Sequence, residues 1–342
     1  MLSLERLDSI LRTLPRLTIG LVGDLFLDRY LHCASGSHEL SIETGLEAYQ
    51  IDHVRNSPGA LGTVLNNLAA LGVGLLAPVT VIGDDGHGFD LLKEVRKLPV
   101  DTAHILCAAD RLTPTYTKPL RQDAAGVWHE LNRLDVRTRG PLSAALTAEV
   151  CRRVEQVFHS SDGLIVLDQL VDEECGVVNA AVRDTLVRLS QRDSGKLIYV
   201  DSRRFLGRFA CGVLKGNRAE VLKADSQGES QAADDVVGRA LATLSNRTRQ
   251  PAYCTLGERG ILVAQPHQPP QMVPGCAVSG PTDIVGAGDA ATSGIVTALL
   301  AGASEIEAAA IGNLVASITI QQLGTTGTAT PQQVRERWQQ IQ

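Results

Sequence analysis

The stretch from residue 163 to residue 201 reads GLIVLDQLVDEECGVVNAAVRDTLVRLSQRDSGKLIYVD, and it decides the fold class. Two short apolar runs, GLIVLD (163–168) and KLIYVD (196–201), enclose a segment with apolar residues at helical spacing, CGVVNAAVRDTLVRLSQR (175–192). The runs are almost continuously apolar, which is typical of strands buried on both faces of a parallel sheet. A strand, a helix and a second strand in this order predict a βαβ unit.

The same alternation extends along the rest of the chain. LTIGLV (17–22) and PAYCTL (251–256) have the composition of two more buried strands, and LSAALTAEVCRRVEQVF (142–158) has the pattern of another helix. The sequence therefore predicts an α/β protein with a central, mostly parallel sheet.

Three segments give signals for boundaries and loops. SQGESQAADD (226–235) and the proline-rich QPHQPPQMVPG (265–275) are expected to be surface connections. SEIEAAAIGNLVASITIQQLG begins with a capping box, Ser304 and Glu307, and its helix is expected to end at Gly324.

Two stretches, about 29–57 and 104–136, break the alternation and place polar residues at every second position. In the second stretch, TYTKPLRQ and VWHELNRLD flank DAAG, which has the composition of a hairpin turn. We expect the two stretches to pair as a small sheet inserted in a single domain of residues 1–342. Such a sheet either shields a site as a lid or extends the core, and its edges could pair with a second subunit to form a homodimer.

Composition narrows the class of partner. The chain has 32 basic and 38 acidic residues, a net charge of -6, so we expect no nucleic-acid partner and favour a small molecule. No apolar run approaches the roughly 18 residues that span a bilayer, and the N-terminus lacks a signal-peptide core. Seven cysteines without a C-x-x-C pair favour the reducing cytoplasm, and the eight histidines form no zinc-binding cluster.

The segment DIVGAGDAATSG (283–294) precedes an apolar run with the spacing of a buried helix. Backbone N–H groups in the first turn of a helix lack partners and attract anions, and Gly286, Ala287 and Gly288 are small enough to let a phosphate approach. A carboxylate beside a stored phosphate would repel it, so Asp289 fits better as the group that takes a proton from an attacking hydroxyl. This pattern indicates phosphoryl transfer.

Two other interpretations also fit this segment. Asp289 could simply cap the helix while the glycines form a tight turn. A dinucleotide fingerprint also fits loosely, but that motif follows a strand directly, whereas SGPTD precedes Gly286. The sequence contains no G-x-x-x-x-G-K-[ST] motif, which excludes a P-loop.

In this segment and in several other motifs, the sequence resembles the ribokinase-like (PfkB) sugar kinases. The motifs that carry the resemblance occur in family order over nearly the whole chain, and the opening GDLFLDRY is similar to that of bacterial heptose 7-phosphate kinase domains. They are GDLFLDRY (23–30), SPGALGTVLNNLAALGV (57–73), VIGDDGHG (81–88), RLD (133–135), NRAE (217–220), TLGERG (255–260), DIVGAGD (283–289) and LGTTGTATP (323–331). The resemblance implies a three-layer α/β/α fold with a small β-sheet lid, and transfer of phosphate from ATP to a sugar or sugar phosphate.

The resemblance also implies roles for individual positions, with Asp289 as the catalytic base. Gly286, Ala287 and Gly288 would form the anion hole. Acceptor-binding residues would be Asp24, Asp28, Gly59 and Thr63, and ATP-binding residues would be Asn217, Glu220, Thr255, Gly257, Gly260 and Asn313. Asn217 and Glu220 would also organise Mg²⁺ through water, and a monovalent cation such as K⁺ would lie at Asp283, Gly324 and Thr328.

Departures from the family pattern concentrate on the acceptor side. The sugar-binding Gly-Gly-x-x-Asn is Gly59-Ala60-Leu61-Gly62-Thr63 here, so an amide that could make two hydrogen bonds is replaced by a hydroxyl. The acidic-Tyr-x-Lys-Gly segment is DQLVD (168–172), without its lysine. These changes leave a second function class open, a non-catalytic relative that binds nucleotide or sugar as a regulatory protein.

Overall fold

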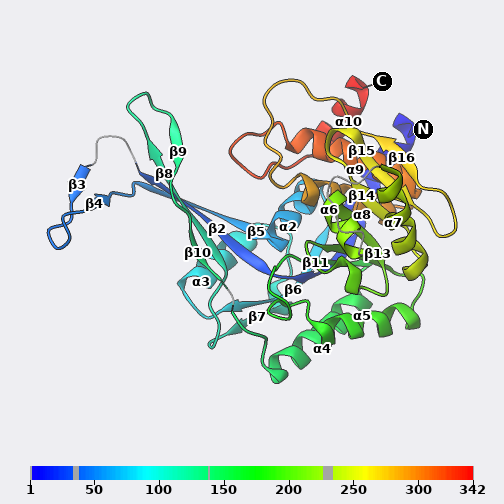
Figure 1. Ribbon diagram of the computed structural model, residues 1–342, viewed down its shortest axis with the longest axis horizontal. Coiled ribbons are helices and arrows are strands. Elements are labelled where there is room, and N and C mark those ends of the chain that lie inside the picture. The colour runs from blue at the N-terminus through cyan, green and yellow to red at the C-terminus, as the bar shows by residue number, and fades with distance from the viewer. Residues whose placement is uncertain (1, 34–37, 138, 226–233, 342) are drawn as a thin grey trace.

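The computed structural model describes residues 2–33, 38–137, 139–225 and 234–341. Figure 1 shows a body in which helices cover both faces of a large sheet, and a long arm of strands that leaves this body at one side. The N- and C-terminal ends lie close together on the body, on the side away from the arm.

The large sheet is parallel except at one edge, as the alternating sequence predicts. Its strand order is β16-β15-β14-β13-β12-β11-β1-β6-β7, and only the β14–β15 and β15–β16 pairs are antiparallel. In that order the strands are Gln271–Pro274, Gly260–Ala264, Ala252–Thr255, Val213–Asn217, Leu197–Ser202, Gly163–Asp168, Thr18–Gly23, Leu75–Gly83 and Ile105–Ala108. The carboxyl ends of the parallel strands therefore form one edge, where ligands of open α/β sheets bind.

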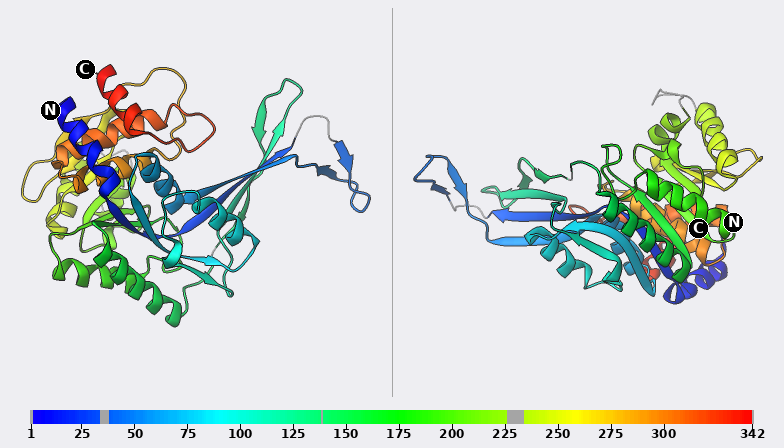
Figure 2. Two further views of the ribbon diagram at one scale, coloured as in Figure 1. Left: turned by 180° about the vertical axis from the view of Figure 1, so that it is seen from behind. Right: turned by 90° about the horizontal axis from the view of Figure 1, so that it is seen from below.

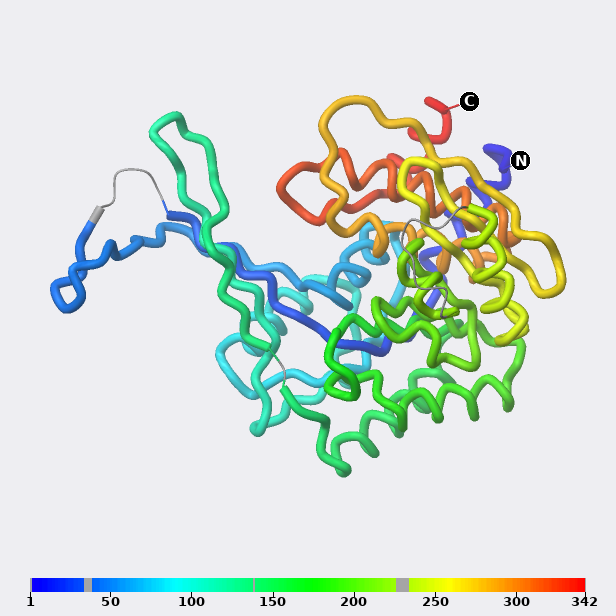
Figure 3. Tube along the Cα trace, viewed as in Figure 1, coloured from blue at the N-terminus to red at the C-terminus, as the bar shows by residue number. Residues whose placement is uncertain are grey.

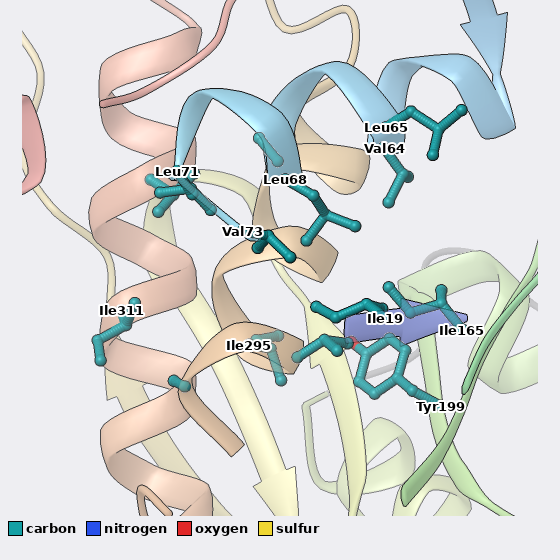
Figure 4. Close-up of a cluster of buried hydrophobic side chains, with 14 of the residues drawn as sticks. Ile19, Val64, Leu65, Leu68, Leu71, Val73, Ile165, Tyr199, Ile295 and Ile311 are labelled. Atoms are coloured by element: carbon teal, nitrogen blue, oxygen red, sulfur yellow. The ribbon is translucent and has the colours of Figure 1, made fainter. Parts of the chain in front are cut away.

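Each face of the sheet has its own hydrophobic core, because successive strand residues point to opposite faces. On one face, residues such as Ile165 and Tyr199 pack against a first set of helices, and Figure 4 shows this core between the sheet, α2, α8 and α9. The first set is α1 (Leu4–Thr13), α2 (Leu61–Ala70), α3 (Gly86–Val95), α8 (Ala287–Leu300), α9 (Glu305–Thr319) and α10 (Pro331–Gln340). The opposite face packs against α4 (Ala144–Ser160), α5 (Ala180–Arg192), α6 (Arg218–Ala224) and α7 (Asp234–Thr248).

The smaller sheet is built from the two polar-alternating stretches. Its order is β10-β8-β2-β5, with β9 paired to β8, and a two-stranded sheet of β3 and β4 continues the arm. The bounds are Leu25–Cys33 for β2, His38–Leu40 for β3, Glu47–Tyr49 for β4, His53–Ala60 for β5, Thr115–Gln122 for β8, Trp128–Glu130 for β9 and Leu134–Val136 for β10. The hairpin expected at DAAG joins β8 to β9 (Figure 3), and both views of Figure 2 show β3 and β4 far from the body. The role of this sheet as a lid stays a prediction.

Some boundaries differ from those that the sequence predicts. Residues 271–274 of the expected loop 265–275 form β16, because they pair with β15 despite the prolines around them. Helix α9 ends at Thr319 rather than at Gly324. In the other expected loop, residues 234 and 235 begin α7, whereas 226–233 lie outside the described residues.

One part of the stretch 104–136 lies in the large sheet. Residues 105–108, within the stretch 104–136, form β7 and pair with β6 in the large sheet instead of the small one.

Within the described ranges, helices long and apolar enough to cross a bilayer are not found.

Candidate active site

The entrance of α8 is built on a left-handed glycine. Gly286 caps the helix with φ 81° and ψ 0°, a conformation that costs little only for a residue without a side chain. A β-carbon at this position would lie 3.4 Å from Thr326 and 3.6 Å from Thr63. The helix entrance, the loop after α9 and the start of α2 therefore meet at one point, which brings Thr63 beside the predicted anion hole.

The amides of the predicted anion hole are not equivalent. The Ala287 N–H donates to the Ile284 carbonyl at 3.1 Å, and helical bonding begins when the Ala290 N–H donates to the Gly286 carbonyl at 2.9 Å. The N–H groups of Gly288 and Asp289 belong to the first turn, where a helix offers them no partner. These two amides are thus better placed to receive an anion than the Ala287 amide.

Asp289 lies half-buried in the first turn of α8 rather than in the apolar core. Desolvation, followed by the nearby charge of Asp201, raises the pKa of its carboxyl from 3.8 to about 7, while Lys215 and Arg203 oppose the shift. A carboxyl that titrates near neutrality is matched to accepting a proton from a hydroxyl and releasing it again.

Lys215 and Asp201 lie beneath this entrance on paired strands, at registered positions of β13 and β12. The Lys215 Nζ donates to the Asp201 Oδ2 at 2.7 Å, and the Thr292 hydroxyl of α8 donates to the same oxygen at 2.9 Å. Neither Asp201 nor Lys215 is among the site residues that the sequence analysis predicts. The available signal was a lone charge inside the apolar strand VLKGN.

Asn217 and Glu220 face the same edge of the sheet and are tied to each other. The Glu220 N–H donates to the Asn217 Oδ1 at 3.0 Å and the Asn217 N–H donates to the Glu220 Oε2 at 2.7 Å, which forms a capping box at the start of α6. Burial, followed by the charge of Asp201, raises the pKa of Glu220 above its usual value. The two residues thus cap α6, and they place the Glu220 carboxyl close to the carboxyls of Asp289 and Asp201.

The remaining predicted ATP-binding residues lie at the antiparallel edge. Thr255, at the end of β14, is in register with Asn217. Gly257 and Gly260 have φ of 62° and 102°, and a β-carbon on Gly260 would collide with the Val273 carbonyl. The Asn313 Nδ2 donates to the carbonyls of Val273 and Pro274 at 3.1 and 3.0 Å, so this amide fixes the end of β16.

On the acceptor side, Asp28 and Gly59 lie against each other across the antiparallel strands β2 and β5. A β-carbon on Gly59 would collide with the Asp28 carboxyl, so the glycine makes room for the acid. Burial raises the pKa of this carboxyl, and the ammonium of Lys118, 3.4 Å from its Oδ1, opposes the shift. Asp28 is thus held by Lys118 on β8 of the small sheet.

Asp24 is almost completely buried, whereas a residue that binds a sugar has to be accessible to it. Its carboxyl is 5% exposed, its Oδ1 accepts a hydrogen bond from the Val177 N–H at 3.0 Å, and its Oδ2 lies against Gly176. Burial raises the pKa of Asp24 to about 6, and burial likewise raises that of Asp168, at the end of the adjacent strand β11, to about 7. Segment 175–177 therefore covers Asp24 in this conformation.

The predicted monovalent-cation residues lie on two loops that meet. The Asp283 N–H donates to the Ile320 carbonyl at 2.8 Å, and Gln322 bonds both the N–H and the carbonyl of Thr328. Gly324, between them, is left-handed with φ 70°. Throughout the described part of the chain, three or more His, Cys, Asp or Glu side chains are nowhere grouped as a metal site.

A cavity of about 690 Å³ opens between the loop after β7 and the residues of β10 and its flanks. It is lined by Asp110, Arg111, Leu112, Arg133, Asp135, Val136, Arg137 and Arg139. The charges of Arg111 and Arg133 reach the acceptor side, since they lower the pKa values of Asp24 and Asp28 respectively. Four guanidinium groups against two carboxylates make this cavity electropositive.

Comparison with known proteins agrees with this geometry. The fold is ribokinase-like: phosphofructokinase-2 from Escherichia coli, in its tetrameric inhibited form, superimposes with a TM-score of 0.70 at 16% identity over 95% of this chain and 99% of that one. The ribokinase of Arabidopsis thaliana complexed with ribose and ATP gives 0.66 at 14% identity over 94% and 98%. The expected α/β/α fold is confirmed.

Residues 196–333, which include Lys215, Glu220 and Asp289, match the model of the pfkB family carbohydrate kinases. The bifunctional protein HldE of Caulobacter sp. (strain K31) is 29% identical over 330 residues, covering 93% of this chain and 63% of its own length. HldE of Caulobacter vibrioides is also 29% identical, with 93% and 64% covered. The C-terminal part of the chain is thus similar to the pfkB family carbohydrate kinases, which confirms the resemblance, and the chain spans a little under two thirds of the length of these relatives.

Proposed function

We propose that this chain transfers the γ-phosphoryl group of ATP to a hydroxyl of a sugar or sugar phosphate. The observation that carries the proposal is the position of Asp289, half-buried beside the N–H groups of a glycine-capped helix entrance and surrounded by charged residues. The acceptor oxygen forms a new bond to phosphorus as the bond to the ADP oxygen breaks, and the hydroxyl proton goes to the Asp289 carboxylate.

The carboxylates around the helix entrance fit a magnesium ion. These carboxylates are not grouped closely enough to bind a metal ion directly, but the charge of Asp201 raises the pKa values of Glu220 and Asp289, so a hydrated cation is favoured nearby. The Asn217 Oδ1 and Glu220 Oε2 already accept hydrogen bonds, which suits a contact through water, the coordination that Mg²⁺ prefers. When bound, Mg²⁺ neutralises charge on the phosphates of ATP.

For the acceptor we propose a sugar that already carries a phosphate. The charge of Arg133 in the arginine-lined cavity reaches Asp28, whose carboxylate can accept two sugar hydroxyls, and guanidinium groups bind phosphate in bidentate fashion. A neutral sugar would leave the surplus positive charge of the cavity without an anionic partner. The lid would then serve as a binding surface as well as a cover.

A panel of neutral sugars and sugar phosphates tests both proposals through ADP release. The proposed function predicts turnover with at least one acceptor, and the acceptor proposal predicts that phosphorylated sugars are preferred. Arg139→Ala should raise the acceptor KM about tenfold, the scale of one charge-assisted contact, without changing the KM for ATP. Arg152→Ala, which removes a surface arginine paired with Glu149 on α4, is the matched control. Turnover of neutral sugars alone would contradict the acceptor proposal.

A monovalent cation is proposed at the loops of Asp283, Gly324 and Thr328. The left-handed turn at Gly324 and the hydrogen bond from the Asp283 N–H to the Ile320 carbonyl support a site that would stiffen the helix entrance from behind. Replacing K⁺ by a tetraalkylammonium ion should lower kcat, and equal activity in both would count against the site.

A homodimer through the arm is proposed as well. Leu40 and Leu46 are 65% and 70% exposed and Ile42 is fully exposed, so the β3–β4 hairpin presents apolar side chains to solvent. An isolated two-stranded hairpin is marginally stable, and a second copy of the chain would cover it. Light scattering should give a dimer for the wild type and a monomer for Ile42→Asp; a monomeric wild type would refute the proposal.

A further inference from the structure

Lys215 occupies an unusual place for a lysine. It lies inside β13 and is only 4% exposed, and its ammonium is fixed by Asp201, which the Thr292 hydroxyl holds in turn. Elements β12, β13 and α8 thus determine where this charge lies. A buried ion pair is weak evidence for a stabilising role, since apolar replacements are often as stable.

The Lys215 ammonium lies against the position where Gly288 lacks a side chain. A β-carbon on Gly288 would lie 3.2 Å from the Lys215 Nζ, so only the missing side chain keeps the space between the ammonium and the helix entrance open. Gly288 is helical, and its backbone conformation needs no glycine. The close approach of Lys215 therefore gives a physical reason for a glycine at this position.

Lys215 stays charged in this environment. Burial opposes its charge, but the carboxylates of Asp201, Glu220 and Asp289 together raise the pKa of the ammonium above its usual value. Counting Arg203, the entrance holds two basic and three acidic side chains. A fixed cation here acts on any negative charge that develops at the first turn of α8.

We infer that Lys215 contacts the transferring phosphoryl group through the gap at Gly288 and, together with the Gly288 and Asp289 N–H groups, stabilises the charge that develops on its oxygens. Asp201 and Thr292 are positioning residues for this ammonium. The inference rests on the proposed function and adds a cation from the chain itself to the helix amides.

Lys215→Met tests the inference because it keeps the length of the side chain and removes the charge. Removing one preorganised donor to a transition-state oxyanion lowers kcat by about 10²–10³, and we expect a loss in this range with the acceptor KM little changed. Lys215→Arg should restore part of kcat, and Lys196→Met, at a distant surface lysine, should behave as wild type.

Two binding measurements separate this inference from the proposed function. Calorimetry with ADP and with a non-hydrolysable ATP analogue, both with Mg²⁺, gives the affinity that the third phosphate adds. Lys215→Met should lose most of that difference, and Asp201→Asn/Lys215→Met, which removes both charges of the pair, should lose it while unfolding at a temperature close to that of the wild type.

The outcomes are distinct. An unchanged difference in affinity in a folded Lys215→Met protein would overturn the role of Lys215, whether or not an acceptor is turned over. Failure of the wild type to phosphorylate any acceptor would overturn the proposed function, and the dependence of triphosphate binding on Lys215 would still decide the inference.

Discussion

Gly59 and Asp28 are in contact across β2 and β5, and the missing side chain of the glycine is what lets the carboxyl lie there. Asp28 is also bound to Lys118 on β8, so this carboxyl on β2 contacts the strands on both sides of β2 in the small sheet. The altered segment Gly59–Thr63 thus keeps the glycine that the acid needs, although it lacks the usual asparagine.

Gly59→Ala should raise the KM for the acceptor, because its β-carbon displaces the Asp28 carboxyl. We expect an increase of about tenfold or more, the scale of a lost hydrogen bond to a charged group, with an unchanged KM for ATP. Steady-state kinetics check this. Gly86→Ala is the control, since a β-carbon at this exposed helical position meets no atom within 4 Å. Equal acceptor KM values in the two variants would contradict the contact.

Asn217→Ala should have two separable effects. Loss of the capping box costs about 1 kcal/mol of stability, and loss of the amide should raise the Mg²⁺ concentration needed for half-maximal activity. Ser304→Ala removes a capping box of the same geometry at α9, so it should cost a similar amount without changing the Mg²⁺ requirement. Urea unfolding and Mg²⁺ titration measure the two effects. If both variants show the same Mg²⁺ requirement, Asn217 is only a cap.

Much of the fold could be predicted because its signals are local. The apolar runs at 163–168 and 196–201 form β11 and β12, and the capping box at Ser304 starts α9. The strand at 271–274 was missed, since pairing with β15 overrides the proline-rich composition that surrounds it. The end of α9 was misplaced because Gly324 is left-handed but lies beyond the helix.

The site was predictable only in part. Asp289 and its glycines are contiguous in sequence, so the helix entrance could be inferred from spacing. Lys215 could not be inferred from spacing, because its contact with Asp201 depends on the register between β12 and β13. The cover that residues 175–177 form over Asp24 likewise depends on tertiary packing.

The stability of the protein should depend on the protonation of Asp289. Its pKa is raised from 3.8 to about 7, so the folded state binds this proton more tightly than the unfolded state. The stabilisation is fully present below pH 3.8, and it is lost as the pH rises toward about 7. Asp289→Asn cannot titrate, so the difference in unfolding free energy between the two proteins should shift in favour of the variant across this window. A difference independent of pH would show that the carboxyl is not perturbed.

The rate of phosphoryl transfer by Asp289→Asn is the most direct test of the account, measured as ADP release at saturating ATP with the best acceptor of the panel. The amide keeps the size of the side chain but cannot accept the hydroxyl proton, so kcat should fall at least about 10² below the wild type. ATP should bind as before, and kcat/KM of the wild type should decline as the pH falls through about 7. A folded Asp289→Asn protein with kcat within about threefold of the wild type would contradict the assignment of Asp289 as the base.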